Sequence, residues 1–256
     1  MSPRPPLRLW AVVFWLAVWQ GLSLALAAAW PHGRLLLASP LEAAARLGEL
    51  ALTASFWQAV GVSSLRILGG FLLGCAAAAA LAVPAAKCRL VRELLAPLVA
   101  AIKSVPVASF IILALVWVNS RHLSLLTAFL MAFPTVYLHT LEGIRRMDRQ
   151  LLEMARVFRV PLLRRLRGLY LPQVLPFFRT AASLSMGLCW KAGTAAEVIG
   201  LPDGTIGEKL YSAKVYFLTP DLFAWTAVIV ALSALMERVF LRIVDSLCAQ
   251  GGQASR

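Results

Sequence analysis

Six long apolar stretches lie along this chain and indicate a membrane protein. They lie at about residues 9–30, 56–83, 94–118, 123–141, 177–199 and 222–244. A helix needs about twenty apolar residues to cross a bilayer, and only helices and closed barrels satisfy their backbone polar groups in lipid. The sequence therefore predicts an all-α membrane protein with about six transmembrane helices, forming a single domain over residues 1–256.

Composition agrees with that class. Hydrophobic residues make up 60% of the 256 residues, against about 45–50% in soluble proteins. The formal charge of +13 could suggest a nucleic-acid partner. Most of the lysines and arginines, however, flank the apolar stretches, which is the pattern of membrane-embedded chains. We therefore predict contact with membrane lipid and no binding of nucleic acid.

The amino-terminal region permits two interpretations. Alanines at 25 and 27–29 resemble a signal-peptidase site, but the apolar run is longer than a signal sequence needs and ends at Trp30. We predict that it is retained as the first transmembrane helix. After it, Ser39 and Pro40 are typical of a helix start. The apolar and charged residues that follow are spaced as in an amphipathic helix, which we expect on the outer membrane surface.

The longest polar interruption, residues 145–176, contains most of the nine arginines found between Arg145 and Arg179. Two short helices are predicted within it, at about 151–158 and 162–171. Pro161 lies between them, where a proline ends one helix and begins the next. This segment, called the elbow below, is too polar for lipid and too short for a domain. It is typical of a docking element on the face of a membrane protein.

The elbow resembles the signature loop of ABC importer permeases, most like those of the sulfonate, taurine and nitrate group. That loop reads Glu-Ala-Ala, three residues, Gly, nine residues, Ile, one residue, Leu-Pro. The matching positions here, with no insertion, are Glu153, Ala155, Leu169, Leu171 and Pro172. Met154 and Arg159 stand where the family has Ala and Gly. The resemblance extends from about residue 35 to residue 237.

The resemblance implies a function and partners. The chain would be the membrane-spanning subunit of an importer in the plasma (inner) membrane of a prokaryote, with two copies around a central passage. It would bind no cofactor, because ATP is hydrolysed on a separate ATPase subunit, present in two copies. A periplasmic or lipid-anchored binding protein would deliver the solute. The residues expected to couple to the ATPase are Glu153, Met154, Ala155, Arg159, Pro161, Leu171 and Pro172.

Arg159 leaves two interpretations open. The family's glycine suits a left-handed turn, which a residue with a side chain adopts at a cost of about 1–2 kcal/mol. Either Pro161 sets the turn here instead, or Arg159 contacts an acidic site on the ATPase. Glu153 is expected near the start of its helix, where a carboxylate interacts favourably with free amides. Ala155 is expected to be small enough for that helix to enter a groove on the partner.

Charged residues and prolines within the apolar stretches are candidates for the translocation pathway. A charge inside a membrane must face a partner or water, and prolines leave backbone carbonyls that need the same. The candidates are Arg66, Lys103, Pro106, Lys191 and Glu197. The three cations would suit an organic anion such as a sulfonate, but helix packing could use them equally well.

The orientation of the chain in the membrane is predicted from the number of lysines and arginines on each side. With six transmembrane helices and both termini in the cytoplasm, seventeen lysines and arginines face inward and five outward, as the positive-inside rule requires. The elbow is then cytoplasmic, where an ATPase would be.

No enzyme motif is present: the sequence lacks a P-loop, an H-E-x-x-H and a G-x-S-x-G pattern. The cysteines and histidines show no metal-binding spacing. The alternative functions are a stand-alone channel or a secondary transporter, although no internal repeat typical of carriers is visible. A membrane enzyme is a more distant alternative.

Overall fold

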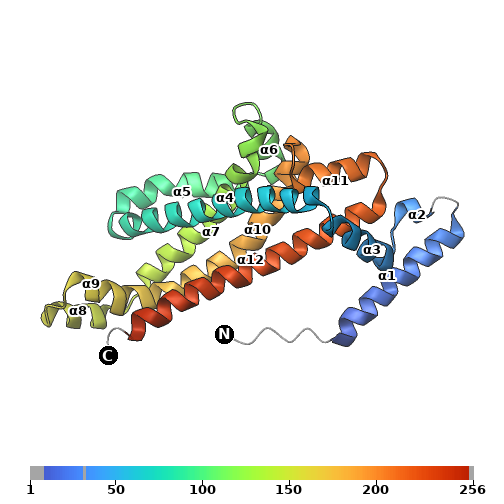
Figure 1. Ribbon diagram of the computed structural model, residues 1–256. Helices are drawn as coiled ribbons and strands as arrows, with labels where there is room; N and C mark the ends of the chain where they lie inside the picture. The colour runs from blue at the N-terminus through green and yellow to red at the C-terminus, as the bar shows by residue number, and fades with distance from the viewer. Residues whose placement is uncertain (1–8, 31–32, 254–256) are drawn as a thin grey trace.

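The computed structural model describes residues 9–30 and 33–253, and all regular structure within them is helical (Figure 1). The helices are α1 (Leu9–Ala29), α2 (Gly33–Leu36), α3 (Pro40–Ala51), α4 (Ala54–Lys87), α5 (Arg89–Ser104), α6 (Val107–Ala114), α7 (Ser120–Arg145), α8 (Arg149–Val157), α9 (Leu162–Arg165), the π-helical η1 (Leu166–Tyr170), α10 (Leu171–Gly200), α11 (Ile206–Val215) and α12 (Thr219–Gln253). The predicted all-α class is therefore confirmed.

The core is formed by α4, α7 and α10, which pack closely because small residues line their contacts. A Cβ added to Gly70 of α4 would lie 2.1 Å from the backbone oxygen of Leu125 in α7. One added to Gly74, a turn later, would lie 2.8 Å from the Cβ of Ala132. Small residues four apart allow helix backbones to approach in lipid, where hydrophobicity alone does not drive helices together.

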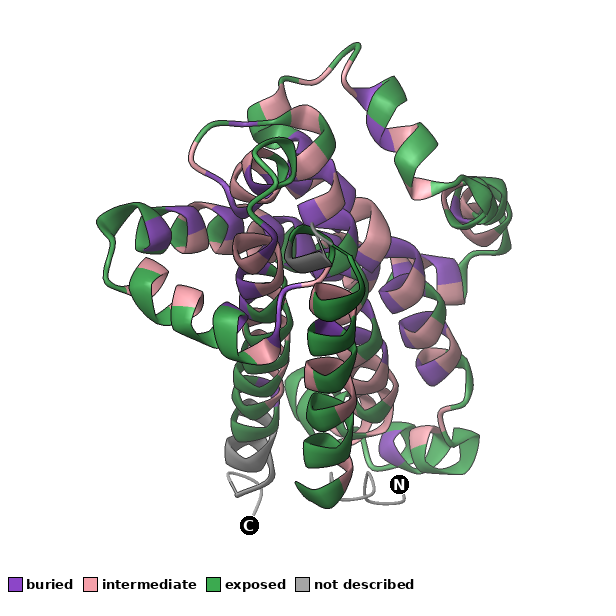
Figure 2. Cartoon of the chain, turned by 90° about the vertical axis from the view of Figure 1, so that its right-hand side faces the viewer, coloured by how far each residue is buried: buried purple, intermediate pink, exposed green. Residues whose placement is uncertain are grey.

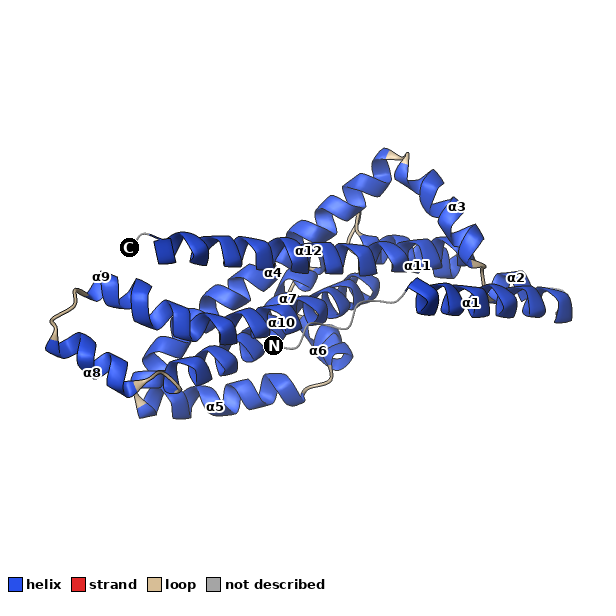
Figure 3. Ribbon diagram, turned by 90° about the horizontal axis from the view of Figure 1, so that it is seen from below, coloured by secondary structure: helices blue, strands red, loops and turns tan. Residues whose placement is uncertain are grey.

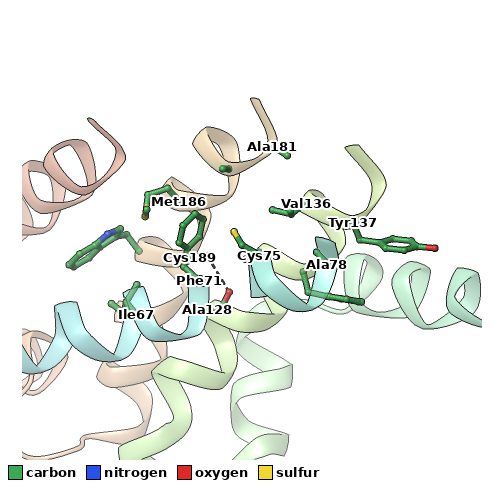
Figure 4. Close-up of a cluster of buried hydrophobic side chains, with 14 of the residues drawn as sticks. Ile67, Phe71, Cys75, Ala78, Ala128, Val136, Tyr137, Ala181, Met186 and Cys189 are labelled. Atoms are coloured by element: carbon green, nitrogen blue, oxygen red, sulfur yellow. Dashed lines mark hydrogen bonds between the residues drawn. The ribbon is translucent and has the colours of Figure 1, made fainter. Parts of the chain in front are cut away.

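Larger side chains fill the remaining core space (Figure 4). Ile67 and Phe71 of α4 and Met186 of α10 are fully buried. The Cys189 thiol donates a hydrogen bond to the backbone oxygen of Ala128, 3.2 Å away. Cys75 and Cys189 are buried and unpaired with each other, as small core residues. Buried residues concentrate in the middle of the bundle, and the outlying helices are mostly exposed (Figure 2).

Within the described residues, three helices are long and apolar enough to cross a membrane individually: α1, α4 and α7. The stretch predicted as one transmembrane helix over residues 94–118 consists of two helices, α5 and α6, bent by 103° at their junction. The bend has a local cause. Pro106 cannot donate a backbone hydrogen bond, and it forces the preceding Val105 into an extended conformation, with φ −73° and ψ 128°.

α10 and α12 cover the last two predicted stretches but are not among these three. Both are long enough, at 30 and 35 residues. In α10, Arg179, Lys191 and Glu197 interrupt the apolar sequence. Such residues are tolerated in a membrane where they face the bundle interior or water, so polarity alone does not exclude these helices from spanning.

The amino-terminal helices are attached at the periphery. Ser39 caps α3 in a reciprocal pair with Glu42, and Pro40 is the first helical residue, as predicted. The Trp19 indole of α1 donates to the backbone oxygen of Ala38 at 3.0 Å. The retention of α1 as the first transmembrane helix stays a prediction. Arg46 joins α3 to α12 by a 2.6 Å ion pair with Asp221, and this carboxylate raises the pKa of the guanidinium above its usual value.

Replacing Gly70 by alanine should destabilise the folded chain by about 1–3 kcal/mol, because the added methyl group collides with a backbone that cannot rotate away. Gly69→Ala is the matched control. Its Cβ would lie 3.8 Å from a Leu125 methyl group, an ordinary contact, and both changes improve helix propensity by about 1 kcal/mol. Thermal unfolding in detergent compares the two variants. Equal melting temperatures would contradict the close packing of α4 on α7.

Candidate functional site

The predicted elbow is the hairpin of α8 and α9, at the end of the molecule opposite α11 and α3 (Figures 1 and 3). Asp148 begins α8, since its carboxylate accepts hydrogen bonds from the amides of Gln150 and Leu151. The Asp148 amide donates to the Gln173 side chain of α10 at 2.9 Å. Glu153, expected near the start of this helix, lies in its middle and is exposed. The carboxylate at the helix start is that of Asp148.

The turn after α8 is left-handed at Arg159, with φ +48°. The amide of Arg159 donates to the backbone oxygen of Arg156, and the amide of Val160 to that of Ala155, both at 3.0 Å. This is the Schellman arrangement, in which glycine normally occupies the left-handed position. The interpretation that Pro161 sets the turn instead is therefore wrong. Pro161 begins α9, and Arg159 keeps the backbone geometry of the family's glycine.

The elbow has one covered and one open side. Ala155 is only 3% exposed, so its side chain is covered by this chain itself and is not accessible to a partner. Met154, Val157 and Phe158 are exposed by 50%, 79% and 74%. Leu162 and Leu163 of α9 are also mostly exposed. A projecting hairpin with several exposed apolar side chains is typical of a protein-binding surface.

The elbow is continuous with α10. α9, η1 and α10 form one helical run from Leu162 to Gly200. At its π-helical turn the amide of Leu171 donates to the backbone oxygen of Leu166, and this wider turn precedes Pro172, which has no amide hydrogen. Leu171 and Pro172, expected at the end of the elbow, thus lie inside an unbroken helical run. The elbow and the core helix α10 are therefore parts of one continuous helical run.

The pathway candidates do not form one cluster. Lys103 and Lys191 are exposed, and neither forms an ion pair within the described part of the chain. Pro106 lies at the bend between α5 and α6. Glu197 is fully buried, and Arg66 is partly buried.

Ser63 of α4 was not among the predicted site residues, although its hydroxyl donates to the Glu197 carboxylate at 2.7 Å. A serine among small residues carries no sequence signal for that pairing.

An apolar cavity of about 670 Å³ lies between α1 and α12. It is lined by Trp15, Val18, Trp19, Leu22, Leu37, Phe223, Thr226, Ala227, Val230 and Ala231. Because none of these side chains is charged, the cavity does not suit a charged solute.

Comparisons with known proteins show what the chain resembles. Residues 70–247 match the family model described as binding-protein-dependent transport system inner membrane component. An aliphatic sulfonates transport permease protein of Escherichia coli (strain K12) is 30% identical over 236 residues, covering 88% of this chain and 87% of that protein. The corresponding Bacillus subtilis protein is 26% identical, covering 90% and 82%. A bicarbonate transport system permease protein of Synechococcus elongatus is 24% identical, covering 72% and 66%.

The left-handed Arg159 yields a prediction about the elbow's backbone. Arg159→Gly should stabilise the turn by about 1–2 kcal/mol, which lowers its opening equilibrium by about five- to thirtyfold. Arg159→Ala removes the same guanidinium but retains the unfavourable φ, so it should give no such gain. Hydrogen exchange at the Val160 amide measures the difference. Similar protection in the two variants would contradict the assigned turn geometry.

Proposed function

The chain belongs to the family of binding-protein-dependent transport system inner membrane components, and on that premise we propose that its elbow is the surface through which an ATPase drives transport. As a member, the chain is the multi-pass inner-membrane permease of an ABC importer and is not itself catalytic. It works with an ATPase subunit and a substrate-binding protein. The alternatives of a stand-alone channel and a secondary transporter do not fit this membership.

The observation that carries the proposal is the continuity of the elbow with α10. The exposed apolar side chains of α8 and α9 would seat in a groove of the ATPase, with Glu153 and Met154 on the accessible side of α8. When two ATPase subunits close on ATP, each elbow would move with them. Because α9 and α10 are one helical run, that movement would shift the core and switch the passage between its inward- and outward-facing states.

We further propose that two copies of the chain surround the passage as a homodimer, each with six transmembrane helices in one domain. The α4–α5 turn, the elbow and the C-terminal part of α12 lie at one end of the molecule (Figures 1 and 3). These segments carry most of the lysines and arginines. Their clustering supports a cytoplasmic location for that end and for the C-terminal end of α12, since cytoplasmic loops are enriched in cations. We propose the same side for the amino-terminal segment, which carries Arg4 and Arg8.

The substrate class we propose is an aliphatic sulfonate or a related small anion. Two of the relatives are named for aliphatic sulfonates and one for bicarbonate. Lys103 and Lys191 are exposed and lack ion-pair partners within the described residues, so both are free to attract an anion. Arg66 and Glu197 are less accessible and are better assigned to helix packing, while Pro106 shapes the bend beside Lys103.

Phe158 offers a test of the docking surface. Phe158→Asp places a charge on a side chain that is 74% exposed, so folding should be unaffected. Association with the ATPase should weaken more than tenfold, because truncating an aromatic interface residue often costs about 2 kcal/mol or more. Pull-down of the ATPase by the purified chain measures the loss.

Phe217→Asp is the matched control for this change. Phe217 is 70% exposed and lies just before α12, away from the elbow, so its replacement should leave ATPase association intact. If Phe158→Asp still binds the ATPase and supports normal uptake, the elbow is not the coupling surface.

Substrate and pathway can be tested together in proteoliposomes that contain the chain, its ATPase and its binding protein. Ethanesulfonate should be imported with ATP, and bicarbonate more weakly. Lys103→Met should lower sulfonate uptake several-fold while leaving the yield of the assembled complex unchanged, because no ion pair is broken. Uptake equal to wild type would remove Lys103 from the pathway, and a lower yield would instead indicate a structural role.

A further inference from the structure

Glu197 is a carboxylate without exposed surface, near the end of α10 remote from the elbow. One oxygen, Oε2, accepts a hydrogen bond from the Ser63 hydroxyl of α4 at 2.7 Å and from the Gly207 amide of α11 at 3.3 Å. Ser63 in turn accepts from the Ile206 amide at 2.9 Å. A single carboxylate therefore links three helices through four groups.

The contacts fall on the first turn of α11. Ile206 and Gly207 are its first two residues, and such amides have no partner within their own helix. The two helices also touch closely: a Cβ on Gly207 would lie 2.3 Å from the Cβ of Glu197. Glu197 and Ser63 thus supply acceptors for the first two amides of α11, while Thr205 caps the third residue, Glu208, at 3.2 Å.

The second oxygen of Glu197 is unused. Within the described residues Oε1 is buried and accepts no hydrogen bond of normal geometry; the nearby Ser124 hydroxyl of α7 is also buried and without a partner. Arg66, one turn after Ser63 on α4, has a buried Nη1 that also lacks a partner. Residues three apart lie on the same face of a helix, so Arg66 projects from the face of α4 whose Ser63 contacts Glu197. Leaving a charged donor and a charged acceptor unpaired in a low-dielectric interior is unfavourable. A small shift of α4 against α10 that brought the Arg66 Nη1 to the Glu197 Oε1 would therefore be favoured.

We propose that Glu197 is a positioning residue for transport: it holds α11 on the core through Oε2, and Arg66 pairs with Oε1 when α4 and α10 shift during the cycle. The second half of this proposal rests on the proposed function, since it assumes that α10 moves with the elbow. The first half concerns the chain alone.

Hydrogen exchange on the purified chain in nanodiscs tests the first half. Glu197→Ala removes both acceptors, and exchange at the Ile206 and Gly207 amides should accelerate at least tenfold. Glu197→Gln retains a carbonyl oxygen for Ser63 and Gly207, so protection should remain near that of wild type. Ser63→Ala should release the Ile206 amide. Unchanged exchange in Glu197→Ala would overturn the assignment.

Uptake by the complete transporter tests the second half. Glu197→Gln and Arg66→Met should each lower uptake at least fivefold while the complex still assembles and hydrolyses ATP. Both changes remove the same Arg66–Glu197 pair, so uptake by the double variant should be no lower than uptake by the more impaired single variant. Normal uptake in either single variant, or multiplied losses in the double variant, would overturn the pairing.

These outcomes differ from a failure of the proposed function. If the elbow did not couple to the ATPase, Phe158→Asp would bind the ATPase and transport like wild type, whereas the exchange results for α11 would be unaffected. If only the pairing of Arg66 with Glu197 is wrong, Phe158→Asp still impairs uptake, but a Glu197 or Arg66 single variant transports normally or the losses multiply in the double variant.

Discussion

The structure depends on the close approach of α4, α7 and α10. In lipid, helices gain little from burying apolar side chains against one another, so their association relies on contact between backbones. Gly70 and Gly74 allow α4 to lie directly on α7. Gly193 similarly accommodates Ile67 between α4 and α10, where an added Cβ would lie 2.7 Å from that side chain. Larger residues at these points would separate the three helices and displace everything attached to them.

Through this packing, α10 connects the two ends of the molecule. One end continues into η1 and α9 without a break, and the other carries Glu197 with its contacts to α4 and α11. A movement applied at the elbow therefore acts on a long helix that is fixed at its far end by hydrogen bonds. Close-packed interfaces tend to switch between discrete arrangements rather than deform gradually. The unused Glu197 oxygen and Arg66 nitrogen suit an element with two arrangements.

Local chemistry was enough to predict much of this chain. The apolar stretches gave the helical class, and Ser39 with Pro40 gave the start of α3 together with its capping pair. The elbow's polarity and prolines predicted a helical hairpin. The spacing of the residues from Glu153 to Pro172 predicted the family, which the comparisons confirm. Each of these features depends on residues within a few turns of one another, so no knowledge of distant partners was needed.

Contacts between distant residues were decided only by the tertiary structure. Ser63 and Glu197 are 134 positions apart, and Arg46 and Asp221 are 175 apart; neither pairing has a local signature. The bend at Pro106 and the left-handed Arg159 are intermediate cases, because the sequence marked both residues but allowed more than one backbone path. The sequence by itself determined which segments are helical and that several of them are apolar enough to span a membrane. Only packing decided which buried polar groups meet, because their partners come from helices far apart in the chain.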